Sequence, residues 1–187
     1  MTDRKTEILE TAAELLESKS FAAFSYQHLA DRLGIRKASI HHHFPTKDDL
    51  GLALLQWYQA NGDAILAHVG EGRTPGETVA AILDLTEEVL LDTNARVCPS
   101  GAFEIDSDAL SDAMCDGIRS LKQRYIQHLA DLLAAARTAG EISFLGEPID
   151  QAGAIAAAQQ GAREAAPILG REFFRGVMRQ LKRSMGL

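Results

Sequence analysis

The sequence predicts an all-α protein of 187 residues. Apolar residues near the start, at Ile8, Ala12, Leu15 and Leu16, follow the three-to-four spacing of an amphipathic helix, and no stretch alternates with the period of a β-strand. With 46% hydrophobic and 24% charged residues, the chain has an ordinary globular composition. Its length suffices for one large domain or for a small module followed by a larger domain.

Polar caps and glycine or proline stops predict four helices in the first part of the chain. The expected spans are 4–19 after Asp3, 26–33 between Ser25 and Gly34, 37–43 before Pro45, and 47–69 after Thr46. The rest of the chain is also helical by its apolar pattern, with Pro75 opening one helix and Gly140 ending another. The expected spans there are 75–92, 107–139, 149–165 and 168–185, with an interruption at 96–106.

Basic residues gather in one window of an otherwise acidic chain. The formal net charge of -7 argues against a protein that coats nucleic acid non-specifically through overall positive potential. The window 32–47 nevertheless holds Arg32, Arg36, Lys37 and Lys47 together with three consecutive histidines, and it has no Asp or Glu. This local excess of positive charge is compatible with a DNA-reading surface.

The same window has the layout of a helix-turn-helix motif, LADRLGIRKASIHHHF, in which two short helices are joined by a tight turn at Gly34. The residues expected to form its internal core are Leu29, Ala30, Leu33, Ile35, Ile40 and Phe44. The residues then left exposed, all able to donate hydrogen bonds to phosphates or base edges, are Arg36, Lys37, Ser39, His41 and His42. The alternative interpretation is a helical pair that packs for structural reasons only.

The run ILETAAELLESKSFAAFSYQHLADRLGIRKASIHHHFPTKDDL resembles the N-terminal domain of the TetR/AcrR family of repressors over nearly its whole length. The resemblance implies an N-terminal three-helix DNA-binding domain at residues 1–48, followed by a helical-bundle domain at 49–187 that binds an effector and dimerises. It also implies which positions contact operator DNA. Carried over by position, these are Ser25, Gln27, Arg36, Lys37, Ala38, Ser39, His41, His42 and Lys47.

Two positions depart from the family pattern. Ala38 stands where the family often has glycine, and His41 stands where it usually has a phosphate-binding tyrosine. A neutral imidazole donates one hydrogen bond and a protonated one adds a positive charge. Operator affinity is therefore expected to weaken as pH rises through the titration of this imidazole.

The sequence does not identify the effector. Candidate pocket residues are aromatic, sulfur-containing or imidazole side chains of the second domain, each of which could equally be ordinary core. They are Trp57, Tyr58, Cys98, Phe103, Met114, Tyr125 and His128. Cys98 precedes Pro99, where a helix N-terminus would favour the thiolate, and its surroundings resemble the cysteine segment of family members that sense electrophiles. The alternative is a small packing residue beside a turn.

The last two helices carry apolar stripes that resemble the pair forming a four-helix dimer interface in this family. The residues expected in that interface are Ile155, Phe174, Val177, Met178 and Leu181. The alternative is that these stripes cover their own domain. A symmetric homodimer would present two recognition helices to a pseudo-palindromic operator.

Other classes of protein and site are not favoured. The two cysteines are too few for a disulfide framework, and adjacent histidines on a helix point about 100° apart, so His41, His42 and His43 cannot converge on a metal ion. No cofactor or metal is expected, and no catalytic motif indicates an enzyme. Neither a membrane span nor a signal peptide is visible, so a cytoplasmic location is expected. A helical protein–protein adaptor that has lost DNA binding is the remaining alternative.

Overall fold

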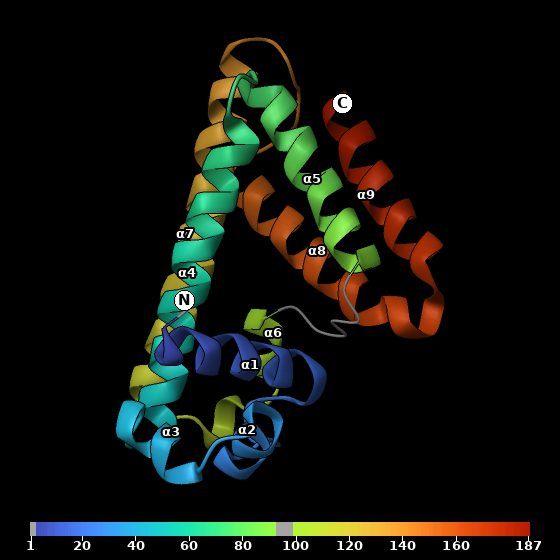
Figure 1. Cartoon of the computed structure of the whole chain (residues 1–187). Helices are drawn as coiled ribbons and strands as arrows, with labels where there is room; N and C mark the ends of the chain where they lie inside the picture. Colours follow the sequence, from blue (N-terminus) through green and yellow to red (C-terminus); the bar gives the residue numbers. More distant parts are fainter. Residues whose placement is uncertain (1–2, 93–98) are drawn as a thin grey trace. The chain divides into compact units, whose positions relative to one another are not determined.

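The computed structural model describes the backbone of residues 3–92 and 99–187, and the side chains of those residues except 87–92, 99, 100 and 107. Within these ranges the secondary structure is entirely helical, as predicted (Figure 1). The α-helices are α1 (Arg4–Lys19), α2 (Tyr26–Leu33), α3 (Lys37–His43), α4 (Lys47–Gly70), α5 (Pro75–Asp92), α6 (Pro99–Glu104), α7 (Asp112–Thr138), α8 (Pro148–Leu169) and α9 (Arg171–Met185), with a 3-10 turn at Ser107–Ala109.

The expected spans hold closely through α5 and differ in two later places. The long helix expected at 107–139 begins at Asp112, because α6 and the 3-10 turn come before it. The junction of the last two helices lies at Gly170, whose φ of 85° ends α8, whereas the sequence placed it between 165 and 168. Pro167 lies inside α8 instead of ending the preceding helix. A proline in the last turn removes only one ladder hydrogen bond, so the helix continues to the left-handed glycine.

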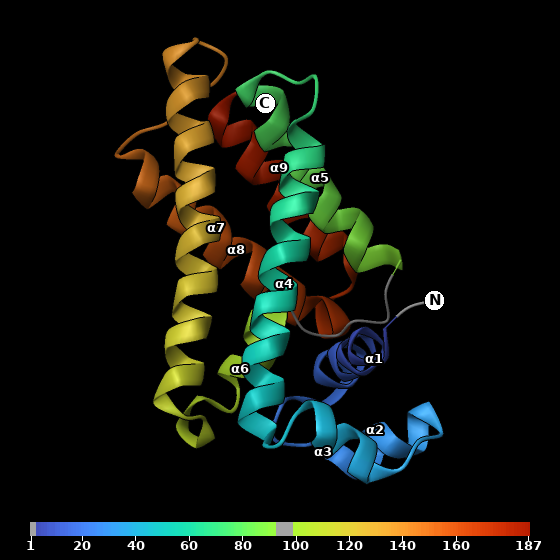
Figure 2. The same cartoon turned by 60° about the vertical axis from the view of Figure 1, so that its left-hand side comes forward.

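The chain forms two compact units. Unit 1 comprises Met1–Asn61 with Val97–Leu121, and unit 2 comprises Gly62–Arg96 with Lys122–Leu187. Helices α4 and α7, labelled in Figure 2, each contribute residues to both units. The expected division at residues 48 and 49 concerns function and stays a prediction.

Unit 1 is built around an aromatic core. Its largest fully buried side chains include Phe24, Phe44 and Phe103, and the Phe103 ring lies 5.2 Å from that of Phe21. Helices α4 and α7 approach each other closely in this unit, because a Cβ atom on Gly51 would lie 2.6 Å from Met114 Cε and 2.8 Å from Phe21 Cζ. Glycine at this position therefore lets the core residues of α7 and of the segment after α1 meet the surface of α4.

Unit 2 has a second, separate core. It is formed by inward-facing residues of α5, α7, α8 and α9, among which Leu83, Leu129, Leu133, Ile155 and Phe174 are completely buried. Thr74 and Gly76 at the start of α5 are joined to Glu141, whose Oε2 accepts from Thr74 Oγ1 at 3.0 Å and from Gly76 N at 2.6 Å. Over the described ranges, none of the helices combines the length and the apolar character that a bilayer crossing requires.

Candidate nucleic-acid interface

Local hydrogen bonds fix both ends of α2. Ser25 Oγ accepts from His28 N at 3.4 Å, and Ser25 N donates to His28 Nδ1 at 3.2 Å, which is a reciprocal cap. At the other end Gly34 has a φ of 64°, a left-handed conformation that glycine adopts without strain. Ile35 N then donates to Ala30 O at 3.1 Å, which closes the tight turn into α3. The caps inferred from sequence at Ser25 and Gly34 are thus confirmed.

The inner face of α3 is anchored in unit 1. Ile40 and Phe44 are buried, as predicted, with Leu33 and Ile35 half-buried beside them. The Tyr26 hydroxyl donates to Phe44 O at 2.9 Å and to Thr46 O at 2.5 Å, which ties α2 to the end of α3. Burial, with a smaller contribution from Asp49, raises the pKa of Tyr26 to about 12, so this hydroxyl keeps its proton at neutral pH.

The outer face of α3 is exposed and basic. Arg36, Lys37, Ala38, His41 and His42 are exposed, and Ser39 is half-buried. The side chains of Arg36 and Lys37 have no hydrogen bond or ion pair with any residue whose side chain is described. By contrast Arg32, at the end of α2, pairs with Glu14 at 3.1 Å. Two unpaired cations at the start of an exposed helix favour an anionic partner for this surface.

The predicted contacts on α2 are also exposed. Ser25 and Gln27 both face solvent, although Gln27 Nε2 already donates to Asp31 Oδ1 at 2.7 Å. His43 is half-buried, with its ring 6.5 Å from that of Phe44. Across the described part of the chain, no three His, Cys, Asp or Glu side chains are grouped in a way that could hold a metal ion.

Lys47 is half-buried, and its ammonium group donates to backbone carbonyls of unit 1. Its contact with DNA stays a prediction. Its Nζ donates to Phe24 O at 2.6 Å and to Ala22 O at 3.3 Å, and it lies 4.9 Å from the centroid of the Phe21 ring. Burial lowers the pKa of Lys47, and the nearby Asp106 opposes that shift. The start of α4 and the segment after α1 come together in the folded unit, so sequence position alone could not reveal these carbonyl acceptors.

Substitution of Lys47 by methionine is expected to lower the free energy of unfolding by about 1–3 kcal/mol, because two carbonyls lose their donor. The salt dependence of DNA binding is expected to stay unchanged. Lys37→Met is the matched control, since its exposed ammonium has no internal acceptor: it should leave stability unchanged and lower the salt slope by about one. Chemical denaturation and DNA titrations at several salt concentrations measure both quantities. Unchanged stability with a lower salt slope for Lys47→Met would instead make it a phosphate contact.

The candidate effector residues fall in both units. Trp57 and Tyr58 are half-buried in unit 1, with the Tyr58 hydroxyl donating to Glu17 Oε1 at 3.1 Å. Phe103 and Met114 are completely buried in the core of unit 1, where packing accounts for them. Cys98 lies outside the described residues, and its reactivity stays a prediction.

Tyr125 and His128 lie one turn apart on α7 in unit 2. The Tyr125 hydroxyl donates to Gln159 Oε1 at 2.7 Å. His128 lines a pocket of about 360 Å³ together with Leu66, Thr78 and Leu132. His128 Nε2 is buried and has no hydrogen-bond partner among the described residues. Of the predicted effector residues, Tyr125 and His128 are the two that belong to unit 2.

The predicted dimer interface needs correction. Ile155 and Phe174 are 0% exposed and Met178 is 2% exposed, so all three pack inside unit 2 and are unavailable to a partner. Val177 and Leu181 are half-buried and line a groove with Phe173, which is 41% exposed and which sequence reasoning missed. Apolar residues occur on two sides of α9, and periodicity does not say which side meets the core of unit 2.

Comparison with known proteins supports the same architecture. Residues 8–54 match the family model described as bacterial regulatory proteins, tetR family. The chain is 42% identical over 53 residues to the HTH-type transcriptional regulator EthR of Mycolicibacterium smegmatis, which covers 28% of this chain and 24% of that protein. It is 25% identical over 118 residues to the HTH-type transcriptional regulator CymR of Pseudomonas putida, which covers 63% of this chain and 57% of that protein. These matches thus span less than two thirds of the curated relatives.

The likeness in structure extends over the whole chain. A TetR-family transcriptional regulator from Agrobacterium tumefaciens superposes with a TM-score of 0.91 at 25% identity, covering 97% of each chain. The sequence match lies on α1 to α4, the helices that carry the basic surface described above, and the structural match includes the helical remainder. Residues 8–54 therefore match the TetR family of bacterial regulatory proteins, and the chain has the fold of a TetR-family regulator.

Proposed function

We propose that the protein is a cytoplasmic, dimeric, ligand-responsive transcriptional repressor that binds a pseudo-palindromic operator through the exposed face of α3. The observation that carries this proposal is the pair of unpaired cations, Arg36 and Lys37, on a helix whose inner face is buried. A recognition helix must be held rigidly on one side and offer free donors on the other. The absence of any Asp or Glu from residues 32–47 leaves phosphate approach unopposed.

The proposed dimer forms through the outer face of α9. Phe173, Val177 and Leu181 recur at every fourth position and line one groove with Gly176 and Gln180. Ile168 is 87% exposed and Leu169 is 58% exposed at the end of α8. Exposed apolar side chains favour a protein partner, and a second copy of the same face satisfies twofold symmetry. Two copies of α3 would then read two half-sites.

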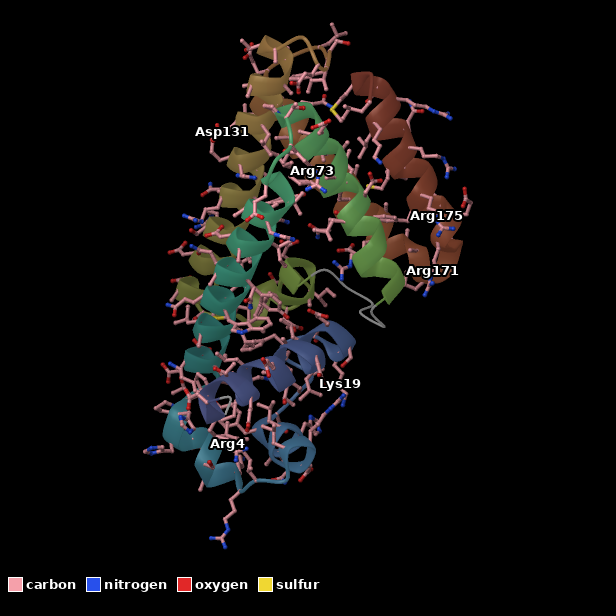
Figure 3. All side chains as sticks on the ribbon, turned by 45° about the horizontal axis from the view of Figure 1, so that its top comes forward. Arg4, Lys19, Arg73, Asp131, Arg171 and Arg175 are labelled. Carbon is pink, nitrogen blue, oxygen red and sulfur yellow. The ribbon has the colours of Figure 1, made fainter. Side chains whose placement is uncertain are left out.

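The double variant Arg36→Ala/Lys37→Ala tests the DNA-binding surface. Each lost phosphate contact lowers the slope of log affinity against log salt by about 0.9, so the double variant should lower it by about two. Arg171→Ala is the control, because Arg171, labelled in Figure 3, is an exposed residue of unit 2, whereas the α2–α3 motif belongs to unit 1. Fluorescence anisotropy with labelled duplex DNA gives the slopes. Equal slopes for the wild type and the double variant, or no binding to any DNA, would leave a protein–protein adaptor as the function.

The contact of His41 with a carbonyl predicts that DNA binding depends on pH. His41 Nδ1 lies 3.2 Å from Pro45 O, and its ring centroid lies 4.7 Å from that of Tyr26. A carbonyl only accepts, so Nδ1 carries the proton, and Nε2 of the neutral ring is then an acceptor. Phosphate oxygens of DNA also only accept. A hydrogen bond from His41 Nε2 to phosphate therefore requires the protonated imidazole.

We expect affinity for DNA to be lower at pH 8 than at pH 6, because a hydrogen bond from Nε2 to phosphate requires a protonated ring and protons are scarcer at pH 8. His41→Tyr should remove most of this dependence, since a phenol donates at both pH values. His42→Gln is the neighbouring control and should keep the dependence. Anisotropy titrations at constant ionic strength measure it. The same pH dependence in the wild type and in His41→Tyr would show that another group is responsible.

A further inference from the structure

A buried arginine in unit 2 lacks a partner among the residues that the structure describes. Arg163 on α8 is 9% exposed, and its Nε is buried with no hydrogen-bond acceptor. No ion pair to a described carboxylate accompanies it. A guanidinium stays charged throughout the pH range of proteins, and a buried charge without a counter-charge destabilises the fold. No residue among those described therefore accounts for a buried guanidinium at this position.

The position of Arg163 on α8 is inward. The buried residues of α8 among those described are Ala152, Ile155, Gln159, Ala162, Arg163 and Ala166, which share one face of the helix. Gln159 and Arg163 are the polar members of this face and lie one turn apart. Pro167 has no N–H to donate to the carbonyl of Arg163, so the hydrogen-bond ladder of α8 is interrupted at the same residue.

The neighbouring polar residue, in contrast, is well satisfied. Gln159 is 6% exposed, and its Oε1 accepts from the Tyr125 hydroxyl at 2.7 Å. Its Nε2 donates to Thr86 Oγ1 at 3.0 Å, and Thr86 Oγ1 donates to Ile82 O at 2.9 Å. This chain of bonds joins α5, α7 and α8 of unit 2. The protein thus supplies partners for the buried amide but, among the described residues, none for the buried cation one turn away.

We propose that Arg163 binds the carboxylate of an apolar organic anion, which would be the effector of the regulator proposed above. A guanidinium matches a carboxylate with two parallel hydrogen bonds, and burial strengthens this pair relative to one in water. The core of unit 2 around α5, α7 and α8 is mostly apolar, with Leu83, Leu129 and Leu133 fully buried. The ligand class is therefore an amphiphile with one anionic head and an aliphatic or aromatic body.

The test uses the full chain, with octanoate and 4-butylbenzoate as probes and 1-octanol as the uncharged control. Isothermal titration calorimetry and thermal unfolding are measured without DNA. At least one carboxylate should bind and raise the Tm by about 3 °C at tenfold excess over its Kd, whereas 1-octanol should not. Arg163→Met should weaken carboxylate binding by about 30-fold or more. Arg163→Lys keeps the positive charge but lacks the planar guanidinium, so it should weaken carboxylate binding by about tenfold.

The unliganded variants separate a binding role from a structural one. Arg163→Met should raise the Tm of the free protein by about 3 °C, because a methionine of similar length replaces an unpaired buried charge. Loss of stability or of folding in Arg163→Met would mean that the guanidinium has a counter-charge within the protein, and would overturn the proposal. Glu87→Gln/Glu88→Gln tests the two carboxylates that follow Thr86 in the sequence: the same loss in this double variant would identify them as that counter-charge.

A surface control and a DNA readout complete the test. Arg171→Met removes an exposed arginine, so it should leave carboxylate binding unchanged. An equal loss of carboxylate affinity in Arg171→Met and Arg163→Met would mean that general charge attraction causes the effect, and would overturn the proposal. If the wild type binds DNA, the carboxylate should release it, and Arg163→Met should stay bound to DNA. Carboxylate binding without any DNA binding would reject the regulator function while leaving the anion site intact. Absence of binding by both carboxylates would reject the anion site itself.

Discussion

Replacement of Phe173 by glutamate is expected to split the dimer and to lower operator affinity about 100- to 10,000-fold. The side chain is 41% exposed and lines the groove on α9, so its substitution spares the core of unit 2 but would place a charge in the proposed interface. A separated protomer binds one half-site without the gain in effective concentration that the second half-site provides. Light scattering at micromolar concentration and anisotropy with operator DNA measure the two effects.

Gln180→Glu should weaken the proposed dimer less than Phe173→Glu does, because it places a carboxylate at the polar edge of the same groove. Circular dichroism should show that Phe173→Glu keeps its helical content. A wild-type protein that is monomeric at micromolar concentration, or a Phe173→Glu protein that remains dimeric with unchanged affinity, would contradict this assignment of the dimer face.

Substitution of the adjacent residue, Phe174, should lower the stability of unit 2, in contrast to the loss of dimerisation expected for Phe173→Glu. Phe174 is 0% exposed and belongs to the core of unit 2, so Phe174→Ala should lower the free energy of unfolding by about 3–5 kcal/mol. The cause is the lost burial of the ring together with the cavity that remains. Urea unfolding followed by circular dichroism gives the value, and it is measured at several protein concentrations so that dimer dissociation is accounted for.

Phe173→Ala is the matched control, with the same atoms removed one position earlier. Its effect on the unfolding free energy of the separated protomer should be below about 1 kcal/mol, because the ring is already partly in water. If the two alanine variants lost equal stability, the orientation of α9 within unit 2 would be wrong.

The pair Phe173 and Phe174 shows where sequence reasoning reached its limit. The apolar period correctly predicted a helix over this region, but it could not decide which of two apolar sides meets the core, since each satisfies a spacing of three to four. That decision depends on α5 and α8, which are distant in sequence. The long-range position of Lys47 near Ala22 and Phe24 escaped prediction for the same reason.

The ends of α2 and the exposed face of α3, in contrast, could be predicted from the sequence. Ser25 and Gly34 fix α2 through hydrogen bonds and a backbone conformation that depend on near neighbours, and the structure confirms both. The exposed face of α3 followed because its buried residues, Ile40 and Phe44, were recognisable from spacing. Arg163 could have been noticed as a charge on the alanine-rich inward stripe of α8, but its lack of a partner among the described residues is visible only in the folded unit.

Selection of DNA from a random duplex library by the purified full-length protein tests the central claim most directly. A symmetric dimer that reads DNA with two copies of α3 should enrich an inverted repeat, whose half-sites are related by twofold symmetry and spaced by about one helical turn or a multiple of it. Binding to that sequence should exceed binding to unrelated DNA by roughly 1,000-fold or more at physiological salt. Arg36→Ala/Lys37→Ala should abolish the enrichment. No enriched sequence, or one that the double variant selects equally well, would contradict the account.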